Sequence, residues 1–240
     1  MPEDITALFT VSIYVEAMLG LLLLYTWVQR PEITAVAWWG SAHLLRAGSI
    51  ALFGSFGTLP DVITVDVANA ILLTSFALTW AGTRRFGGRE VNFVLVFAGA
   101  IIWQVARQMP EVAASDALRS LLSSAIIAAY VWLAAAEIWR LNEGQLISRL
   151  PAFFILFAQG ALFLLRTPLG AFMPRVAGAE PLFDSLWLVV LSSQALLLTI
   201  ATAFVLMAMA KERAGRLQKT MANRLAGVPG QGGLISNPTH

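Results

Sequence analysis

The last long apolar segment of the chain constrains the fold more than any other feature. It begins near Leu182, stays almost entirely apolar to Ala210, and continues without a break into a polar stretch that reaches Leu225. No proline lies between Pro181 and Pro229, so nothing in this stretch interrupts a helix. Forty residues of α-helix are about 60 Å long, about twice the thickness of a bilayer's hydrocarbon core. We therefore expect a helix that crosses a membrane and projects well beyond it.

Composition predicts the same environment for the remaining chain. Of the 240 residues, 58% are hydrophobic and only 12% are charged, whereas ordinary soluble domains carry about 25% charged residues. The apolar residues form long runs rather than helical stripes, which is typical of helices that face lipid. The sequence thus predicts an all-α integral membrane protein. The absence of cysteine excludes disulfides, thiolate metal sites and cysteine nucleophiles.

Seven apolar segments are predicted to span the membrane, and no internal repeat of the kind found in two-fold transporters is visible. The predicted spans are approximately residues 5–28, 34–56, 62–81, 91–106, 118–138, 150–166 and 182–210. We divide the chain into a membrane bundle (1–210), a cytoplasmic juxtamembrane helix (211–225) and an irregular tail (226–240). The tail is rich in glycine and contains Pro229, a composition that disfavours regular structure.

The distribution of basic residues predicts the orientation. With the N-terminus outside, eleven lysines and arginines fall in the inner loops and tail, and only four fall in the outer loops. This asymmetry follows the positive-inside rule. Trp27, Trp80 and Trp139 close the first, third and fifth spans, each with an arginine within four residues, as expected for an aromatic belt at the inner surface. We expect the N-terminus outside and the C-terminus in the cytoplasm.

Four ionisable residues lie inside the predicted spans. Glu16 is near the middle of the first span, His43 and Arg46 share one face of the second, and Asp66 is in the outer third of the third. Charged groups at this depth are costly, so they are expected to pair or to face a cavity. Arg46 can meet Glu16 at its own depth or reach outward to Asp66. Three interpretations remain: a structural ion pair, a polar ligand pocket, or part of a proton path.

No catalytic, metal or cofactor site is expected. Bis-histidine haem ligation requires two imidazoles inside the membrane, but the only other histidine besides His43 is His240. A retinal Schiff base requires a lysine within a span, and both lysines, Lys211 and Lys219, follow the last one.

The juxtamembrane helix carries a spacing of 3, 4, 3 and 4 residues between Met207, Ala210, Ala214, Leu217 and Met221. Such spacing is typical of the seam of a parallel coiled coil, which predicts a homodimer through the last helix. The alternative is a basic solvated helix that contacts anionic lipid headgroups.

The chain from Met207 onward reads Met-Ala-Met-Ala-Lys-Glu-Arg and later Asn-Arg-Leu-Ala-Gly-Val-Pro. It resembles the junction in membrane-bound bacterial diguanylate cyclases of the GGDEF family, where a Met-Ala-x-x-Lys-Glu-Arg helix leads to a motif close to Asp-x-Leu-Thr-Gly-Leu-x-Asn-Arg-Arg. Residues 37–40, 69–72 and 80–85 are also similar to such sensor regions. The positions that fit the motif are Leu225, Gly227 and Leu234, and those that depart from it are Asn223, Ala226, Gly230, Gln231 and Gly232.

The resemblance implies a membrane sensor region in the bacterial inner membrane that transmits a signal along its last helix. No Gly-Gly-Asp/Glu-Glu-Phe loop is present, so we expect no enzyme activity and interpret residues 226–240 as the degenerate start of an absent output domain. The expected partners are the lipid bilayer, a second copy of the chain or a larger membrane complex, and not nucleic acid. The alternative function is an accessory subunit of a respiratory or photosynthetic complex. A transporter ranks third because no repeat is present.

Overall fold

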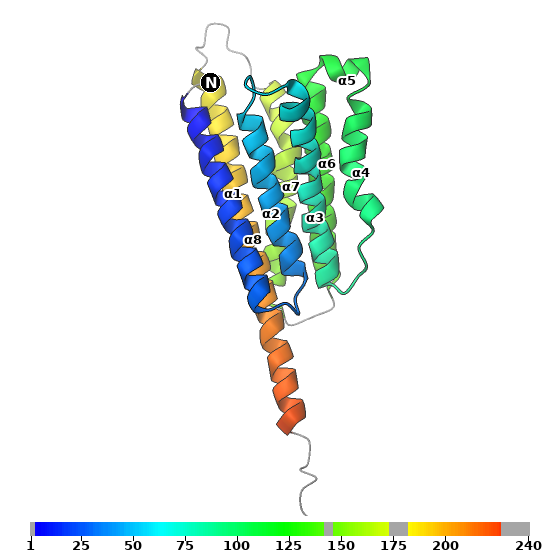
Figure 1. Cartoon of the computed structure of the whole chain (residues 1–240). Coiled ribbons are helices and arrows are strands. Elements are labelled where there is room, and N and C mark those ends of the chain that lie inside the picture. Colours follow the sequence, from blue (N-terminus) through cyan, green and yellow to red (C-terminus); the bar gives the residue numbers. More distant parts are fainter. Residues whose placement is uncertain (1–2, 142–145, 173–181, 227–240) are drawn as a thin grey trace, which may run out of the picture.

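The computed structural model describes residues 3–141, 146–172 and 182–226, and side chains within 7–141, 146–165 and 193–224. The described chain is helical and contains no β-strand. Its elements, in order, are α1 (Glu3–Gln29), α2 (Ala35–Gly54), the π-helical turn η1 (Val62–Val67), α3 (Ala68–Phe86), α4 (Phe93–Ala106), α5 (Pro110–Ala114), α6 (Asp116–Trp139), α7 (Arg149–Phe172) and α8 (Leu182–Ala226). The long helices lie side by side and alternate in direction, and the C-terminal part of α8 projects from one end of the bundle (Figure 1).

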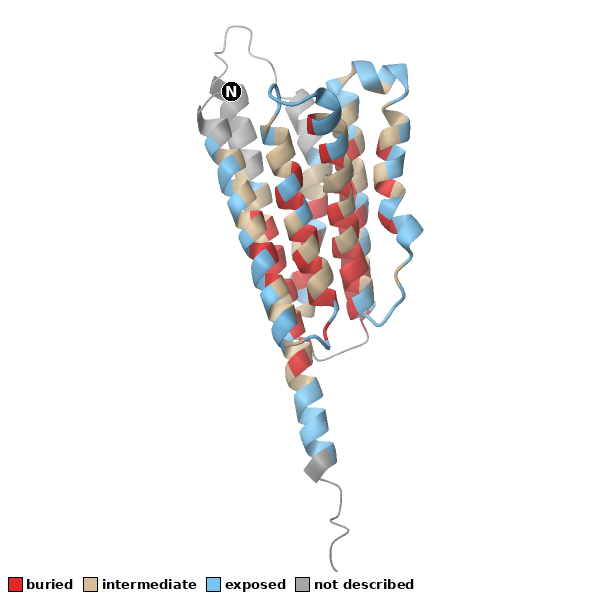
Figure 2. Ribbon diagram, viewed as in Figure 1, coloured by how far each residue is buried: buried red, intermediate tan, exposed pale blue. Residues whose placement is uncertain are grey.

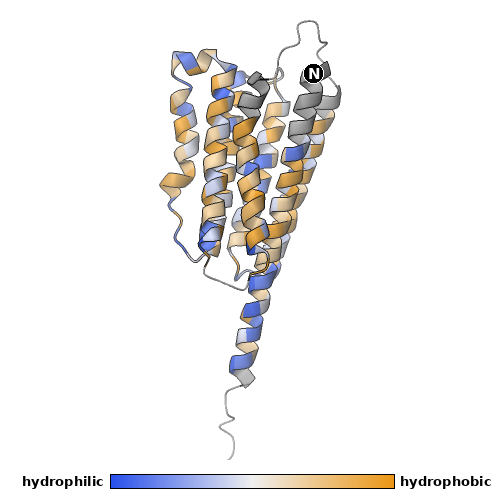
Figure 3. Cartoon of the chain, turned by 180° about the vertical axis from the view of Figure 1, so that it is seen from behind, coloured by the Kyte–Doolittle hydropathy of each residue, from blue (hydrophilic) through white to orange (hydrophobic). Residues whose placement is uncertain are grey.

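Four helical segments are long and apolar enough to cross a membrane within the described chain. They are Ala7–Gln29, Val62–Phe86, Asp116–Trp139 and Ser193–Arg224. Two further apolar segments are shorter, Phe93–Ala106 and Arg149–Leu165. Figure 3 shows the apolar character along the bundle and the polar character of the projecting part of α8. The all-helical class predicted from the sequence is confirmed, and these segments indicate a membrane protein.

Local sequence signals explain several helix ends. The side chain of Asn92 accepts a hydrogen bond from Val94 N at the start of α4, and Ser115 accepts one from Leu118 N at the start of α6. Both residue types are preferred helix caps because their side chains satisfy otherwise free backbone N–H groups. After α3, Gly88 adopts a φ of 73°, a left-handed conformation that costs glycine little.

The structure refines the predicted boundaries. The third helix begins with η1 and runs on to Phe86, beyond the expected end at residue 81. The sixth was expected to end near residue 166, but α7 continues to Phe172. The short helix α5 was not predicted. The long last helix is confirmed as one continuous element of 45 residues that passes through Gly215.

The core lies between the helices, and the outward faces remain apolar. Buried residues gather on the inner faces of α2, α3 and α6 (Figure 2). Trp39 is fully buried in this core and packs against Phe86, with ring centroids 5.6 Å apart. Large apolar side chains such as Tyr14, Met18 and Val94 are strongly exposed on the outside. An apolar exterior of this extent is suited to contact with lipid.

Candidate functional site

A buried polar centre joins the first two helices. Glu16 on α1 and His43 and Arg46 on α2 are only 3%, 2% and 5% exposed. His43 Nδ1 lies 2.6 Å from Glu16 Oε2, and Arg46 Nη1 donates to Glu16 Oε1 at 3.4 Å. Because a carboxylate beside a guanidinium accepts hydrogen bonds, we assign the proton of this contact to His43 Nδ1. Each oxygen of Glu16 is therefore bound by a different side chain of α2.

Arg46 extends the same centre to the third helix. Its Nη2 donates to Thr79 Oγ1 at 3.3 Å, and its guanidinium lies 4.1 Å from the centre of the Phe76 ring. Thr79 in turn donates to the carbonyl oxygen of Ser75 at 3.2 Å. Arg46 Nε is buried and has no hydrogen-bond partner within the described chain. The guanidinium thus connects α1, α2 and α3 through polar and cation–π contacts, while its Nε–H makes no hydrogen bond within the described chain.

The close approach of α1 and α2 depends on two glycines that the sequence analysis missed. A Cβ placed on Gly20 would lie 2.9 Å from the carbonyl oxygen of Gly40, and one on Gly40 would lie 3.0 Å from the carbonyl oxygen of Gly20. Gly20 follows Glu16 by four residues, so this crossing lies one turn from the polar centre. Small residues on facing helices allow such contacts in membranes. The only sequence feature that could have indicated this contact was an isolated glycine within each of two apolar helices. The sequence alone does not show that the two glycines face each other.

We expect Gly20→Ala to destabilise the bundle by about 1–3 kcal/mol, the usual cost of overpacking. In a helix, alanine is intrinsically more favourable than glycine by about 1 kcal/mol. A net loss of stability in Gly20→Ala would therefore show that the close backbone contact matters more than helix propensity. Unfolding by SDS in mixed micelles measures the difference. The matched control is Gly48→Ala on α2, where an added Cβ meets no atom within 4 Å. Equal stability changes for the two variants would contradict the close crossing.

The structure separates Asp66 from the other three predicted site residues. Asp66 lies in η1, and its Oδ1 accepts a hydrogen bond from Arg107 Nε at 2.7 Å. Gln104 Nε2 donates to the backbone oxygen of Asp66 at 3.2 Å. The expected cluster of four is therefore corrected to a cluster of three and a separate ion pair. Arg107 follows α4, whose end lies beside η1, and this distant packing was not visible in the sequence.

A second buried carboxylate was also missed. Glu137, near the end of α6, is bound by Arg84 Nη1 and Arg89 Nη1, each at 3.0 Å from one of its two oxygens. Arg84 also lies over the Trp80 ring, 5.3 Å from its centroid. The sequence signal was an acidic residue just before Trp139, at the same predicted surface as the basic loop after α3. This cluster fixes the ends of α3 and α6 together.

Two contacts hold α8 where it leaves the bundle. Glu212 Oε1 accepts hydrogen bonds from Ser148 Oγ at 2.5 Å and from Ser148 N at 3.2 Å, just before the start of α7. Arg213 Nη1 donates to the carbonyl oxygen of Phe86, the last residue of α3, and its guanidinium lies over the Phe86 ring. We call these four residues the exit clasp. It connects α8 to the ends of two other helices.

The predicted dimer seam is used largely within one chain. Ala210 and Ala214 are buried in the core, and Met207 packs against it. Leu217 and Met221 remain exposed. The alternating spacing therefore marks the face of α8 that meets its own bundle down to Ala214, so Ala210 and Ala214 are not part of an exposed dimer seam. A homodimer through the rest of α8 stays a prediction. Deeper in the bundle, Thr202 Oγ1 donates to Gln159 Oε1 at 3.2 Å and joins α8 to α7.

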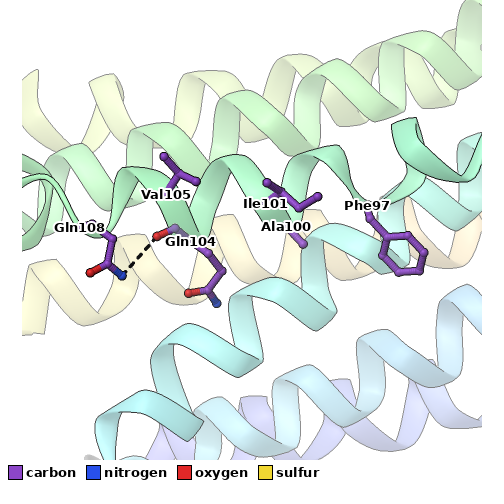
Figure 4. A pocket seen from close by; sticks show the side chains of 6 residues that line it. All are labelled: Phe97, Ala100, Ile101, Gln104, Val105 and Gln108. Atoms are coloured by element: carbon purple, nitrogen blue, oxygen red, sulfur yellow. Dashed lines mark hydrogen bonds between the residues drawn. The ribbon is translucent and has the colours of Figure 1, made fainter.

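An open groove of about 350 Å³ runs along α4 (Figure 4). Its lining comes from this helix and the turn that follows it: Phe97, Ala100, Ile101, Gln104, Val105 and Gln108. The polar groups are already engaged, since Gln108 Nε2 donates to the Gln104 carbonyl oxygen at 3.5 Å and Gln104 binds the backbone of Asp66. The groove is thus an uneven part of the apolar exterior, and the buried centre of Glu16, His43 and Arg46 remains the candidate site.

The described residues contain no group of three or more His, Cys, Asp or Glu side chains placed to hold a metal ion. In the buried centre, both oxygens of the only carboxylate are occupied by neighbouring side chains. The arrangement can neutralise charge inside the bundle and hold a titratable imidazole against a carboxylate. Comparisons with protein families, curated proteins and solved structures found no match to this chain.

Proposed function

We propose that the chain is a non-catalytic sensor module of the bacterial inner membrane that crosses the bilayer seven times and transmits a signal through α8. In this proposal the N-terminus is outside and the C-terminus is cytoplasmic. The proposed output is a diguanylate cyclase domain of the GGDEF type joined or bound to the end of α8. This last element rests on the resemblance of residues 207–234 to the junction in that family.

The proposed orientation is supported by the separation of charge between the two ends of the bundle. Residues 30–34, 84–92 and 137–149, which are the loops after α1, α3 and α6 with the adjoining helix ends, and α8 from Lys211 onward together carry eleven basic and five acidic residues in the sequence. In the sequence, residues 1–4, 57–66, 107–119 and 166–184, which include the segments that join the helices on the other side, hold four basic and eight acidic residues. Only Glu16 and Arg46 lie between, and they form a pair. An excess of positive charge on one side favours that side as cytoplasmic.

Reporter fusions test the topology. Alkaline phosphatase fused after residue 220 is expected to be inactive, and a fluorescent protein at the same position is expected to be bright, because both would lie in the cytoplasm. Phosphatase fused after residue 112, within α5, provides the matched control and should be active. Phosphatase activity from the fusion after residue 220 would exclude the seven-span arrangement.

The observation that carries the proposed transmission is the continuity of α8 across the exit clasp. α8 packs against α1 and α7 inside the bundle, and the same helix continues past Ala214 to Ala226. The backbone hydrogen bonds of a helix close within the segment, so rotation or translation at one end reaches the other. Movement of α1 or α7 can therefore be passed to whatever follows Ala226.

The buried polar centre supports the proposal from the input side. It connects α1 to α2 and α3 through Glu16 and Arg46, and α1 is a direct neighbour of α8. A change at the centre that shifts α1 thus has a short physical route to the output helix. A reporter enzyme fused after Arg224 tests the proposal, because its signal-dependent activity should depend on the rotational phase of α8 relative to the bundle.

A further inference from the structure

The end of α6 and the start of α7 place two arginines at one corner of the bundle. Arg140 is the exposed residue that follows α6. Arg149, the first residue of α7, donates from Nη2 to the carbonyl oxygen of Trp139 at 2.5 Å. Its guanidinium also lies 5.6 Å from the centre of the Trp139 ring. We call this place, where the two helix ends meet at Arg140 and Arg149, the α6–α7 corner.

The positive charge at the α6–α7 corner is not neutralised by the described carboxylates. Glu137, one turn earlier on α6, is bound by Arg84 and Arg89 instead. Glu212 accepts its hydrogen bonds from Ser148. None of the ion pairs in the described chain includes Arg140 or Arg149. The corner therefore presents cationic donors that a bound anion can use.

An exposed apolar stripe on α7 begins at the same corner. Leu150, Phe154 and Phe157 are spaced by four and three residues, so they share one face of the helix, and they are 53%, 62% and 51% exposed. Trp139 is also about half exposed, and its ring packs 4.9 Å from that of Phe153. Tryptophan at a helix end beside arginine is characteristic of the level of lipid headgroups. Cationic groups thus lie at the end of α7 from which an exposed apolar stripe begins.

We propose that the α6–α7 corner binds an anionic phospholipid. Its phosphate is held by Arg140 and Arg149, and one acyl chain lies along Leu150, Phe154 and Phe157. Anionic headgroups are favoured because the net positive charge of this end of the bundle repels the ammonium of a zwitterionic headgroup. The inference requires that the bundle lies in a membrane, and it is independent of signal transmission through α8.

Lipid binding to the purified full chain tests the proposal. Native mass spectrometry with added phosphatidylglycerol, and with phosphatidylcholine of the same acyl chains, gives the two dissociation constants. We expect a clear preference for phosphatidylglycerol in the unmodified protein. The double variant Arg140→Gln/Arg149→Gln should bind it about thirtyfold more weakly, from roughly 1 kcal/mol for each lost basic residue. Arg140→Gln alone, at an exposed position, should show part of this loss without disturbing the Trp139 contact.

The matched control is Lys219→Gln/Arg224→Gln, which removes the same charge from exposed positions on the projecting part of α8. This variant should retain phosphatidylglycerol binding. If both double variants bound phosphatidylglycerol equally weakly, the binding would reflect the general attraction of a basic protein for anionic lipid. That result would contradict a specific site at the α6–α7 corner. Equal affinity for phosphatidylcholine, or full competition by inorganic phosphate at equimolar concentration with the lipid, would also overturn the proposal. Phe154→Ala distinguishes a phospholipid from inorganic phosphate as the ligand. The variant should bind phosphatidylglycerol more weakly, whereas the affinity of a site for free phosphate would not change.

Discussion

Replacing Arg46 with alanine is expected to lower the free energy of unfolding by about 3–5 kcal/mol, the typical cost of breaking a buried ion pair. The substitution leaves the Glu16 carboxylate buried with His43 as its remaining partner. It also removes the hydrogen bond to Thr79 and the cation–π contact with Phe76. SDS-induced unfolding in mixed micelles measures the loss directly.

Two variants identify the source of this effect. Thr79→Ala removes one hydrogen-bond acceptor and should cost only about 1 kcal/mol. The double variant Glu16→Leu/Arg46→Leu leaves neither charge buried, so it should be more stable than Arg46→Ala alone. A free energy of unfolding for Arg46→Ala within about 0.5 kcal/mol of the original, the range of ordinary surface substitutions, would show that Glu16 does not need the guanidinium.

Inserting two residues after Gly215 is expected to abolish or invert the signal dependence of a reporter enzyme fused after Arg224. Two helical residues rotate the downstream segment by about 200° relative to the bundle. The position is suitable because a side chain at Gly215 would meet no neighbouring atom within 4 Å. The insertion also follows the exit clasp, so the contacts of Glu212 and Arg213 are left in place. Activity with and without stimulus is the measurement.

An insertion of seven residues is the control for added length. Seven residues complete nearly two turns and restore the original phase to within about 20°, while moving the output about 10 Å further away. Signal dependence should therefore survive seven residues and fail with two. If both insertions behave like the original chain, α8 is a passive tether and the proposed transmission is wrong.

The sequence predicts helices better than it predicts contacts between them. Long apolar runs define segments such as α4 because helix formation depends on neighbouring residues. The predicted positions along the spans allowed Arg46 to pair with either Glu16 or Asp66, and the structure shows the pair with Glu16. The partner of Asp66 was not predictable, because Arg107 is 41 residues away and reaches it only through the packing of α4 beside η1.

The repeat on α8 shows a different limit. Spacing of three and four residues indicates that one face of a helix is covered, but it does not identify the covering surface. The alternating residues were assigned to a second copy of the chain, whereas Ala210 and Ala214 are covered by the same chain's bundle. Likewise, Gly20 and Gly40 are individually unremarkable, and their role appears only when the two backbones meet.

The position of the exit clasp determines which movements of α8 can be large at its far end. From Leu182 to Arg213 the helix measures about 48 Å, and from Ala214 to Ala226 about 20 Å. A rigid rod that pivots at the clasp is a lever with a long inner arm and a short outer arm. Sideways displacement at the inner end is reduced to less than half at the outer end, whereas twist about the axis and sliding along it pass through undiminished. An output domain attached to this lever would therefore respond to torsion or piston motion far more than to swinging.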